Sequence, residues 1–270
     1  VLDNLAWQPP TYLVPVADKL TVENKILREQ QHASLGFDYL LQLAMSTDGK
    51  IDYQKEQEKL ENRAVTGDMI AQFDLGQMYQ YAIGVAKDTE KAIEYYELAA
   101  AQGSLPAEYN LGIIYLKGDG VEANYKLALQ WLTDAAFKGN DYAQFTLARL
   151  YENGYEDEEG KEVIKADHEQ AMAMYNIAAA NNYGPAQFRL AEIMVREKPI
   201  DLSEKGKRKR NRLIKELYAQ ALANHDSRAE LPLAYYNAMS QVSAKQQLAY
   251  DVANKLAKDG NKDAALLLGL

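Results

Sequence analysis

The side chains that most often carry out chemistry in proteins are sparse and scattered in this sequence. Three histidines, His32, His168 and His225, lie far apart, and none has a second histidine or cysteine at the spacing of a metal site. Cysteine is absent, which excludes disulfides, thiolate ligands and a cysteine nucleophile. No G-x-S-x-G elbow and no glycine-rich phosphate loop occurs. We therefore expect no catalytic residues, no cofactor and no metal, and a protein that is not an enzyme.

An acidic run at Glu156, Asp157, Glu158, Glu159 and Glu162 is the first of two charged features. Carboxylates attract Ca²⁺, but this run lacks the alternating ligand spacing and the terminal bidentate glutamate of a calcium loop. A solvated loop is the favoured interpretation.

A basic run between residues 205 and 215 is the second charged feature. Its members are Lys205, Lys207, Arg208, Lys209, Arg210, Arg212 and Lys215. Such a run is typical of nucleic-acid or localisation elements, yet the surrounding chain is acidic and no stacking aromatic lies within the run. A solvated extension of a helix is favoured. A salt-sensitive contact of Lys207, Arg208, Lys209 and Arg210 with an acidic protein partner remains open.

Composition excludes some classes of partner. The chain of 270 residues carries a formal net charge of −9, and 47% of its residues are hydrophobic. That charge argues against binding nucleic acid or an anionic membrane surface. No segment approaches the roughly 20 apolar residues of a membrane span. The absence of cysteine fits a reducing cytosol and bacterial export equally well.

The architecture that positions all these side chains is indicated by a repeat in the sequence. Leu75, Gly76 and Tyr79 recur 36 residues later as Leu111, Gly112 and Tyr115, and 36 residues later again as Leu147, Ala148 and Tyr151. A period of this length predicts a solenoid in which each repeat buries its apolar face on its neighbours.

Each repeat reads as two helices joined by a loop. In the clearest repeat, Ala71 to Tyr79 has helical apolar spacing, Asp88 is placed to cap a second helix, and Gly103 is placed to end it. Asn124 is the equivalent cap one repeat on, and Asp167 with Gln170 predicts a capping box. Gly76 should let a second backbone come close. The connection in the fourth repeat is expected to hold Lys198-Pro199 and the basic run.

These patterns predict an array of about six repeats, followed by the start of another. The ranges are approximately 23–67, 68–103, 104–139, 140–182, 183–225 and 226–260, with 261–270 opening a further repeat. The first of them has Leu35, Gly36 and Tyr39 in its first helix and a second helix from about Tyr53 to Ala64. Residues 1–22 include a proline-rich stretch and are expected to form an extended arm or linker. We interpret the chain as a fragment of a longer array.

The stretch from Ala71 to Gly103 resembles the Sel1-like repeat, a relative of the tetratricopeptide repeat. The residues that fit the family pattern are Ala71, Leu75, Gly76, Tyr79, Gly84, Val85, Asp88, Lys91, Ala92, Tyr95, Tyr96, Ala99, Ala100 and Gly103. Ala82 departs from it, because the loop's first glycine is expected there. The resemblance is specific for two repeats and good for a third.

The resemblance implies an all-α, right-handed superhelical solenoid of antiparallel helix pairs whose first helices form a concave face. Such proteins act as adaptors, many of them bacterial. The composition is similar to that of the enhanced-entry type, which implies a virulence or envelope factor that regulates a peptidoglycan-cleaving enzyme or binds a host protein. A periplasmic or secreted location is expected, with the cytoplasm as the alternative.

By analogy with tetratricopeptide repeats, one stripe of the first helices lines the concave face. The candidate partner-binding residues are Phe73, Gln77, Tyr109, Ile113, Phe145, Arg149, Phe188, Glu192 and Tyr235. The aromatic series is nearly constant, as packing alone would require. The other series varies from repeat to repeat, which suits either a recognition surface or an idle solvent face. Two other interpretations compete with a scaffold: the helical part of a cell-wall-acting enzyme, and a structural spacer in a longer array.

Overall fold

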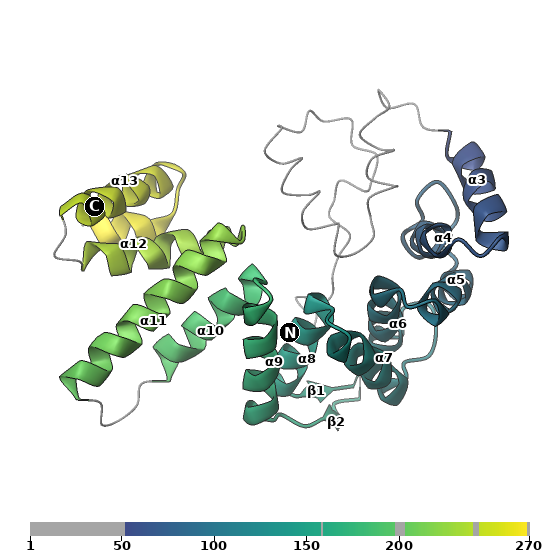
Figure 1. Ribbon diagram of the computed structural model, residues 1–270, viewed down its shortest axis with the longest axis horizontal. Coiled ribbons are helices and arrows are strands. Elements are labelled where there is room, and N and C mark those ends of the chain that lie inside the picture. Colours follow the sequence, from purple (N-terminus) through teal and green to yellow (C-terminus); the bar gives the residue numbers. More distant parts are fainter. Residues whose placement is uncertain (1–51, 158, 198–202, 240–242, 269–270) are drawn as a thin grey trace. The chain divides into compact units, whose positions relative to one another are not determined.

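The computed structural model describes residues 52–157, 159–197, 203–239 and 243–268 as a succession of helix pairs (Figure 1). It divides into an N-terminal unit that ends at Ala166 and a C-terminal unit that begins at Asp167. The N-terminal unit contains α3 (Tyr53–Val65), α4 (Met69–Tyr81), α5 (Thr89–Ala101), α6 (Leu105–Lys117), α7 (Tyr125–Phe137), α8 (Asp141–Asn153), β1 (Tyr155–Glu156) and β2 (Glu162–Ile164). The C-terminal unit contains α9 (His168–Ala180), α10 (Gly184–Arg196), α11 (Glu204–Ala223), the short 3₁₀ helix η2 (Ser227–Ala229), α12 (Glu230–Ala238), α13 (Ser243–Lys258) and α14 (Lys262–Leu268). The predicted all-α array of helix pairs is confirmed.

Polar caps start the second helices where the sequence predicts them. The side chain of Asp88 accepts a hydrogen bond from the backbone N–H of Lys91 at 3.0 Å, and Asn124 does the same for Leu127. Asp167 likewise accepts from the Gln170 backbone at 3.0 Å. A capping box would use the Gln170 side chain as the acceptor for the Asp167 backbone N–H. In the structure the Gln170 amide instead donates to the Asp167 carboxylate at 3.0 Å.

Three-residue turns join each second helix to the next first helix within both units. The middle residue of these turns has a positive φ, a conformation that glycine adopts without strain. It is Gly67, Gly103 and Gly139 in the N-terminal unit, and Asn182, His225 and Gly260 in the C-terminal unit. His225 therefore has a backbone role in this turn, because histidine adopts a positive φ more readily than most residues. Among the described residues it belongs to no group that could hold a metal ion. The connections from first to second helix vary in length, from four residues to fourteen.

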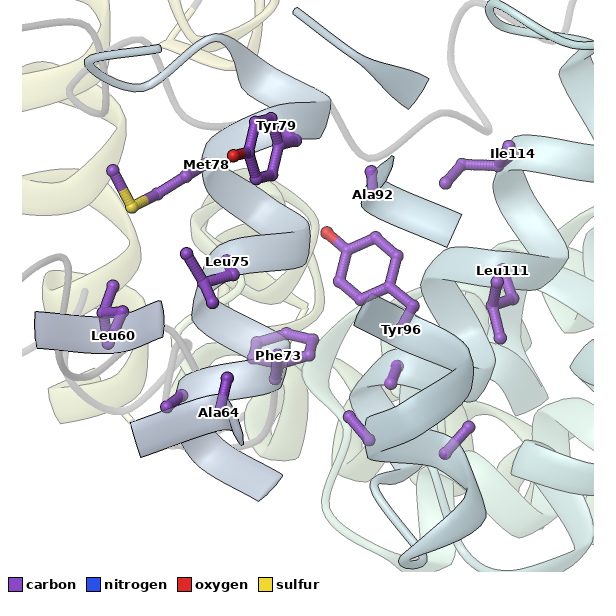
Figure 2. Packing of buried hydrophobic residues seen from close by; sticks show 14 of the residues in the cluster. Leu60, Ala64, Phe73, Leu75, Met78, Tyr79, Ala92, Tyr96, Leu111 and Ile114 are labelled. Carbon is purple, nitrogen blue, oxygen red and sulfur yellow. The ribbon is translucent and has the colours of Figure 1, made fainter. Parts of the chain in front are cut away.

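The core of the N-terminal unit lies between α3, α4, α5 and α6. Figure 2 shows the ring of Tyr96 on α5 beside Phe73 on α4, with the ring centroids 5.6 Å apart. The Tyr96 hydroxyl donates to the side-chain oxygen of Gln80 at 2.7 Å. A Cβ atom built on Gly76 would lie 2.6 Å from the Tyr96 ring, so the group that comes close to Gly76 is a side chain and not the second backbone that the sequence predicted.

A short hairpin replaces the loop that the sequence predicts between α8 and α9. Strand β1 pairs antiparallel with β2, and the acidic run occupies this hairpin. Tyr155 anchors it, because its ring meets Tyr125 edge-on at 5.4 Å and its hydroxyl donates to the Leu116 carbonyl at 3.3 Å. The β-branched pair Val163-Ile164 explains why this stretch is extended, and the acidic composition hides that signal.

The basic run forms part of α11, as the favoured interpretation of a helix extension predicts, and not part of the connection that holds Lys198-Pro199 in the sequence. Lysine and arginine are good helix formers, and Ser203 caps the helix by accepting from the Gly206 backbone at 3.2 Å. Farther along α11, Ile214 and Tyr218 are buried in the core of the C-terminal unit together with Phe188. The predicted helix from Tyr53 to Ala64 is confirmed as α3. Leu35, Gly36, Tyr39 and residues 1–22 lie outside the described residues.

Buried tyrosines should make the fold sensitive to alkali. Burial raises the pKa of Tyr109 and of Tyr218 to about 12, and it also raises the pKa of Tyr96. The unfolded chain therefore releases these protons near pH 10, before the folded chain does. We expect the free energy of unfolding to fall as the pH rises from about 10 to about 12, by roughly 2–3 kcal/mol for Tyr109 alone.

Urea unfolding followed by circular dichroism at several pH values between 8 and 12 measures this loss. A Tyr109→Phe variant should lose less stability over the same range, since phenylalanine has no proton to release. A stability that stays constant up to pH 12 would contradict the prediction.

Candidate functional site

No cluster of metal-ligating side chains occurs among the described residues. His168 is exposed and lies 3.7 Å from Glu197, and His225 occupies an inter-repeat turn. His32 lies outside the described residues. Within the described part of the chain, no helix is both long enough and apolar enough to cross a bilayer.

Four of the candidate residues in the N-terminal unit lie within its packed interior. On α4, Phe73 and Gln77 are buried, and on α6, Tyr109 and Ile113 are buried. The Tyr109 ring lies 6.0 Å from that of Tyr142 on α8. The remaining candidates of this unit, Phe145 and Arg149 on α8, are half-buried.

Gln77 is the most unusual member of this series. It has no exposed surface, and neither its amide nitrogen nor its amide oxygen has a hydrogen-bond partner among the described residues. Burying an amide without hydrogen bonds costs free energy. The polar side chain therefore does not serve stability, and an aliphatic residue would suit this position better.

The three candidates in the C-terminal unit differ in their surroundings. Phe188 on α10 is buried, and the Arg228 guanidinium lies 4.5 Å from its ring centroid. Glu192, half-buried on α10, accepts a hydrogen bond from Arg189 at 2.9 Å. Tyr235 on α12 is exposed, so it is the candidate in this unit that is most accessible to a partner.

A pocket opens at the start of the first helices of the N-terminal unit. Its volume is about 390 Å³, and its walls come from the first turns of α4, α6 and α8 and from two inter-repeat turns. The lining residues are Met69, Ile70, Phe73, Gly103, Ser104, Leu105, Pro106, Gly139, Asn140 and Asp141. Of the predicted site residues, Phe73 alone belongs to this set.

Exposed apolar side chains lie at this pocket and beside it. Ile70 lines it and is 53% exposed. Phe137, which is 78% exposed, directly precedes the turn that supplies Gly139 and Asn140. An apolar floor with exposed hydrophobic residues beside it is typical of a site that receives a side chain of another protein.

The polar groups beside the pocket belong to helix starts. Asp68 and Asn140 cap α4 and α8 through their side chains, whereas Ser104 makes no such bond at the start of α6. In the first turn of α6, the buried carboxylate of Glu108 lies 2.5 Å from the Lys138 ammonium group. This contact raises the pKa of Lys138. The pair ties α6 to the turn after α7 and holds this wall of the pocket in place.

The side chains of the basic run have two different environments in the structure. Lys207, Arg208 and Lys209 are exposed on α11. Arg210 instead points to α10, where its guanidinium donates to the carbonyl oxygens of Met194 and Val195 at the end of that helix.

Comparison with known families identifies the repeat. The Sel1 repeat matches three successive stretches, residues 70–104, 105–140 and 141–183. This part of the chain consists of three Sel1 repeats. Sel1 repeats generally serve as non-enzymatic scaffolds for protein–protein interaction, and the three matched repeats contain every residue that lines the pocket except Met69.

Solved Sel1-repeat structures share the fold. One of them is a protective antigen of uropathogenic Escherichia coli strains, which displays an SLR fold. It matches with 22% sequence identity and a TM-score of 0.63, and the match covers 89% of this chain and 49% of the antigen's chain. The chain thus spans about half the length of that protein. A Sel1 repeat protein from Oxalobacter formigenes matches with 24% identity and a TM-score of 0.62, over 94% of this chain and 91% of its own. A comparison with curated proteins finds no match.

The repeat pattern did not predict the pocket, although the residues at the helix starts carry a signal for it. Helix α4 begins with Met69-Ile70 and α6 with Leu105-Pro106, whereas α8 begins with Asp141. These apolar residues occur in two neighbouring repeats, and all four line the pocket.

Proposed function

We propose that this protein is a non-enzymatic scaffold that binds a protein partner along the first helices of its N-terminal unit. The observation that carries the proposal is the apolar pocket formed by three successive repeats, with Ile70 exposed at it. The occupant is an apolar side chain presented by a segment of the partner. The half-buried Phe145 and Arg149 on α8 extend the contact along the same set of helices.

The proposal also covers the partner and its compartment. We propose an envelope protein such as a peptidoglycan-cleaving enzyme, met in the periplasm or outside the cell. The absence of cysteine is compatible with an oxidising compartment. Fractionation of the native cells, followed by detection of the full-length protein, tests the compartment, and a purely cytoplasmic signal would contradict it.

The pocket makes a sharp prediction, because the chain supplies a matched control. Ile70 at the pocket and Leu98 on α5 are exposed to nearly the same extent, 53% and 51%, and Leu98 does not line the pocket. We expect Ile70→Glu to weaken partner binding at least tenfold, because it removes an apolar contact and puts a carboxylate in its place. Leu98→Glu should change binding less than twofold. Glutamate in the first turn of α4 is favourable for the helix, so folding should be preserved.

The experiment has two stages. Wild-type chain, Ile70→Glu and Leu98→Glu serve as bait in parallel, and proteins retained by the wild type and by Leu98→Glu but not by Ile70→Glu are identified. The affinity of each purified candidate is then measured by calorimetry against all three chains. If every retained protein binds the two variants equally, the pocket is not the binding site.

A further inference from the structure

Helix α11 is longer than the other helices of the array. Each described helix from α3 to α10 has 13 residues, whereas α11 has 20. The core tyrosine is the eighth residue of α5 and of α9, as Tyr96 and Tyr175, but the fifteenth of α11, as Tyr218. The seven additional residues therefore lie at the start of α11, ahead of the part that packs into the core.

This extension is strongly basic and exposed. Lys207 pairs with Glu204 at 2.7 Å, and Arg212 pairs with Glu216 at 2.8 Å. Across the described residues, no carboxylate pairs with Lys205, Arg208 or Lys209. Arg210 fixes the extension to the end of α10 through the carbonyl oxygens of Met194 and Val195.

These charges oppose the stability of the helix that carries them. The start of a helix is the positive end of its dipole, so lysine and arginine are unfavourable there. Lys205 and Lys209, and likewise Arg208 and Arg212, are four residues apart on the helix and repel each other. Such an arrangement is expected where the charges serve binding, because a partner of opposite charge removes the repulsion.

The cationic surroundings continue beyond the extension. Burial lowers the pKa of Lys215 on α11, and the positive charge of Lys245 on α13 lowers it further. In the C-terminal unit as a whole, fifteen lysines and arginines outnumber twelve aspartates and glutamates, although the complete chain carries a charge of −9. The positive charge of the molecule is therefore concentrated in this unit.

An apolar side chain lies within the cationic surface. Leu213 is 44% exposed and follows Lys209 by four residues, so the two share one side of α11 with Lys205. We call Lys205, Arg208, Lys209, Arg212 and Leu213 the basic face of α11. The other two members, Arg208 and Arg212, lie next to this line on the helix surface.

We propose that the basic face of α11 is a second binding surface, and that it binds an acidic protein segment with an apolar side chain between its carboxylates. Such a segment supplies a contact for Leu213 and a charge for each unpaired cation. A polynucleotide fits less well, because no aromatic side chain is present in the basic face for bases to stack on. The acidic chain also repels polyanions and anionic membranes at a distance, whereas a short segment senses mainly the charges within about 10 Å.

The test uses the full chain and a triple variant, Lys205→Gln/Arg208→Gln/Lys209→Gln. The probe is a fluorescent synthetic helical peptide of about 15 residues with glutamates on both sides of a leucine stripe. We expect fluorescence anisotropy to show binding by the wild type that weakens as salt is raised, and at least tenfold weaker binding by the triple variant. The control variant, Lys255→Gln/Lys258→Gln/Lys262→Gln, removes the same charge elsewhere in the C-terminal unit and should bind within twofold of the wild type.

Thermal unfolding separates a binding role from a structural one. Because the three cations oppose the helix, the triple variant should melt at the same temperature as the wild type or above it. A clearly lower melting temperature, equal losses of binding in both triple variants, or no binding of the peptide by the wild type would each overturn the proposal. Tighter binding to single-stranded DNA of similar length, or to vesicles of phosphatidylglycerol, would overturn the assignment to a protein partner. Because Ile70 is unchanged in all these chains, a failure here leaves the pocket proposal intact, and the reverse also holds.

Discussion

Replacing Tyr96 with alanine should lower the free energy of unfolding by about 3–5 kcal/mol, the range for removing a large buried aromatic ring. Tyr96 has no exposed surface, and its ring packs beside Phe73 (Figure 2). The same ring occupies the space that a Cβ atom on Gly76 would need. Its loss would leave a cavity between α4 and α5 and remove the hydrogen bond to Gln80. Because each repeat is held mainly by its neighbours, this damage should also weaken the cooperativity of unfolding.

Urea unfolding followed by circular dichroism gives both quantities, since the slope of the transition reports cooperativity. The neighbouring Tyr95 is the matched control: it is half-buried and stacks on Tyr79 with a centroid distance of 5.9 Å. Tyr95→Ala should cost clearly less than Tyr96→Ala. Equal costs for the two variants would show that Tyr96 has no special place in the core.

Placing leucine at Gly76 should destabilise the fold by about 3 kcal/mol, at the upper end of the range for overpacked cores. Even a Cβ atom would lie 2.6 Å from two carbons of the rigid Tyr96 ring, and leucine adds three more carbon atoms. Alanine at this position should cost less than leucine, because it is the better helix former and the two helices need to separate only slightly. The fourth repeat carries Ala191 at this position, in the same hydrophobic cluster as Tyr218.

The two substitutions should compensate each other when combined. In Gly76→Leu/Tyr96→Ala, the leucine enters the space that the ring has left, so the double variant should be more stable than the sum of the single costs predicts. A coupling free energy between about 0.5 and 3 kcal/mol is expected for groups in contact. Strict additivity would show that the two positions do not meet in the folded protein.

The repeat period predicted the helix pairs and their caps because both depend on neighbouring residues in the sequence. Asp88 and Asn124 cap helices that begin one residue later, and Gly103 takes the positive φ that ends its helix. The basic run was correctly interpreted as the extension of a helix, but its assignment to the connection after Lys198-Pro199 was wrong, because the helix already begins at Glu204. The hairpin after α8 was not predicted. Five acidic residues indicated a solvated loop, and only two β-branched residues indicated an extended segment.

The candidate site could be predicted only in part, because burial depends on contacts between repeats. Helical spacing places Gln77 and Arg149 at equivalent positions, yet Gln77 is fully buried and Arg149 is not. The pocket joins the starts of three helices that are 36 residues apart from one to the next, and no local pattern reveals such a junction. That the predicted residues contact a partner stays a prediction. The Ile70→Glu variant tests binding at the pocket that Phe73 also lines, and Leu98→Glu is its control.

The turns between repeats always have three residues, whereas the connections inside repeats range from four to fourteen. A gene built in this way can lengthen one set of connections during evolution without changing the spacing of the other. The acidic hairpin lies within one such connection, and the basic extension of α11 directly follows another. New partners could thus be acquired one repeat at a time, while the pocket, which is built from the turns of constant length, keeps its inherited form.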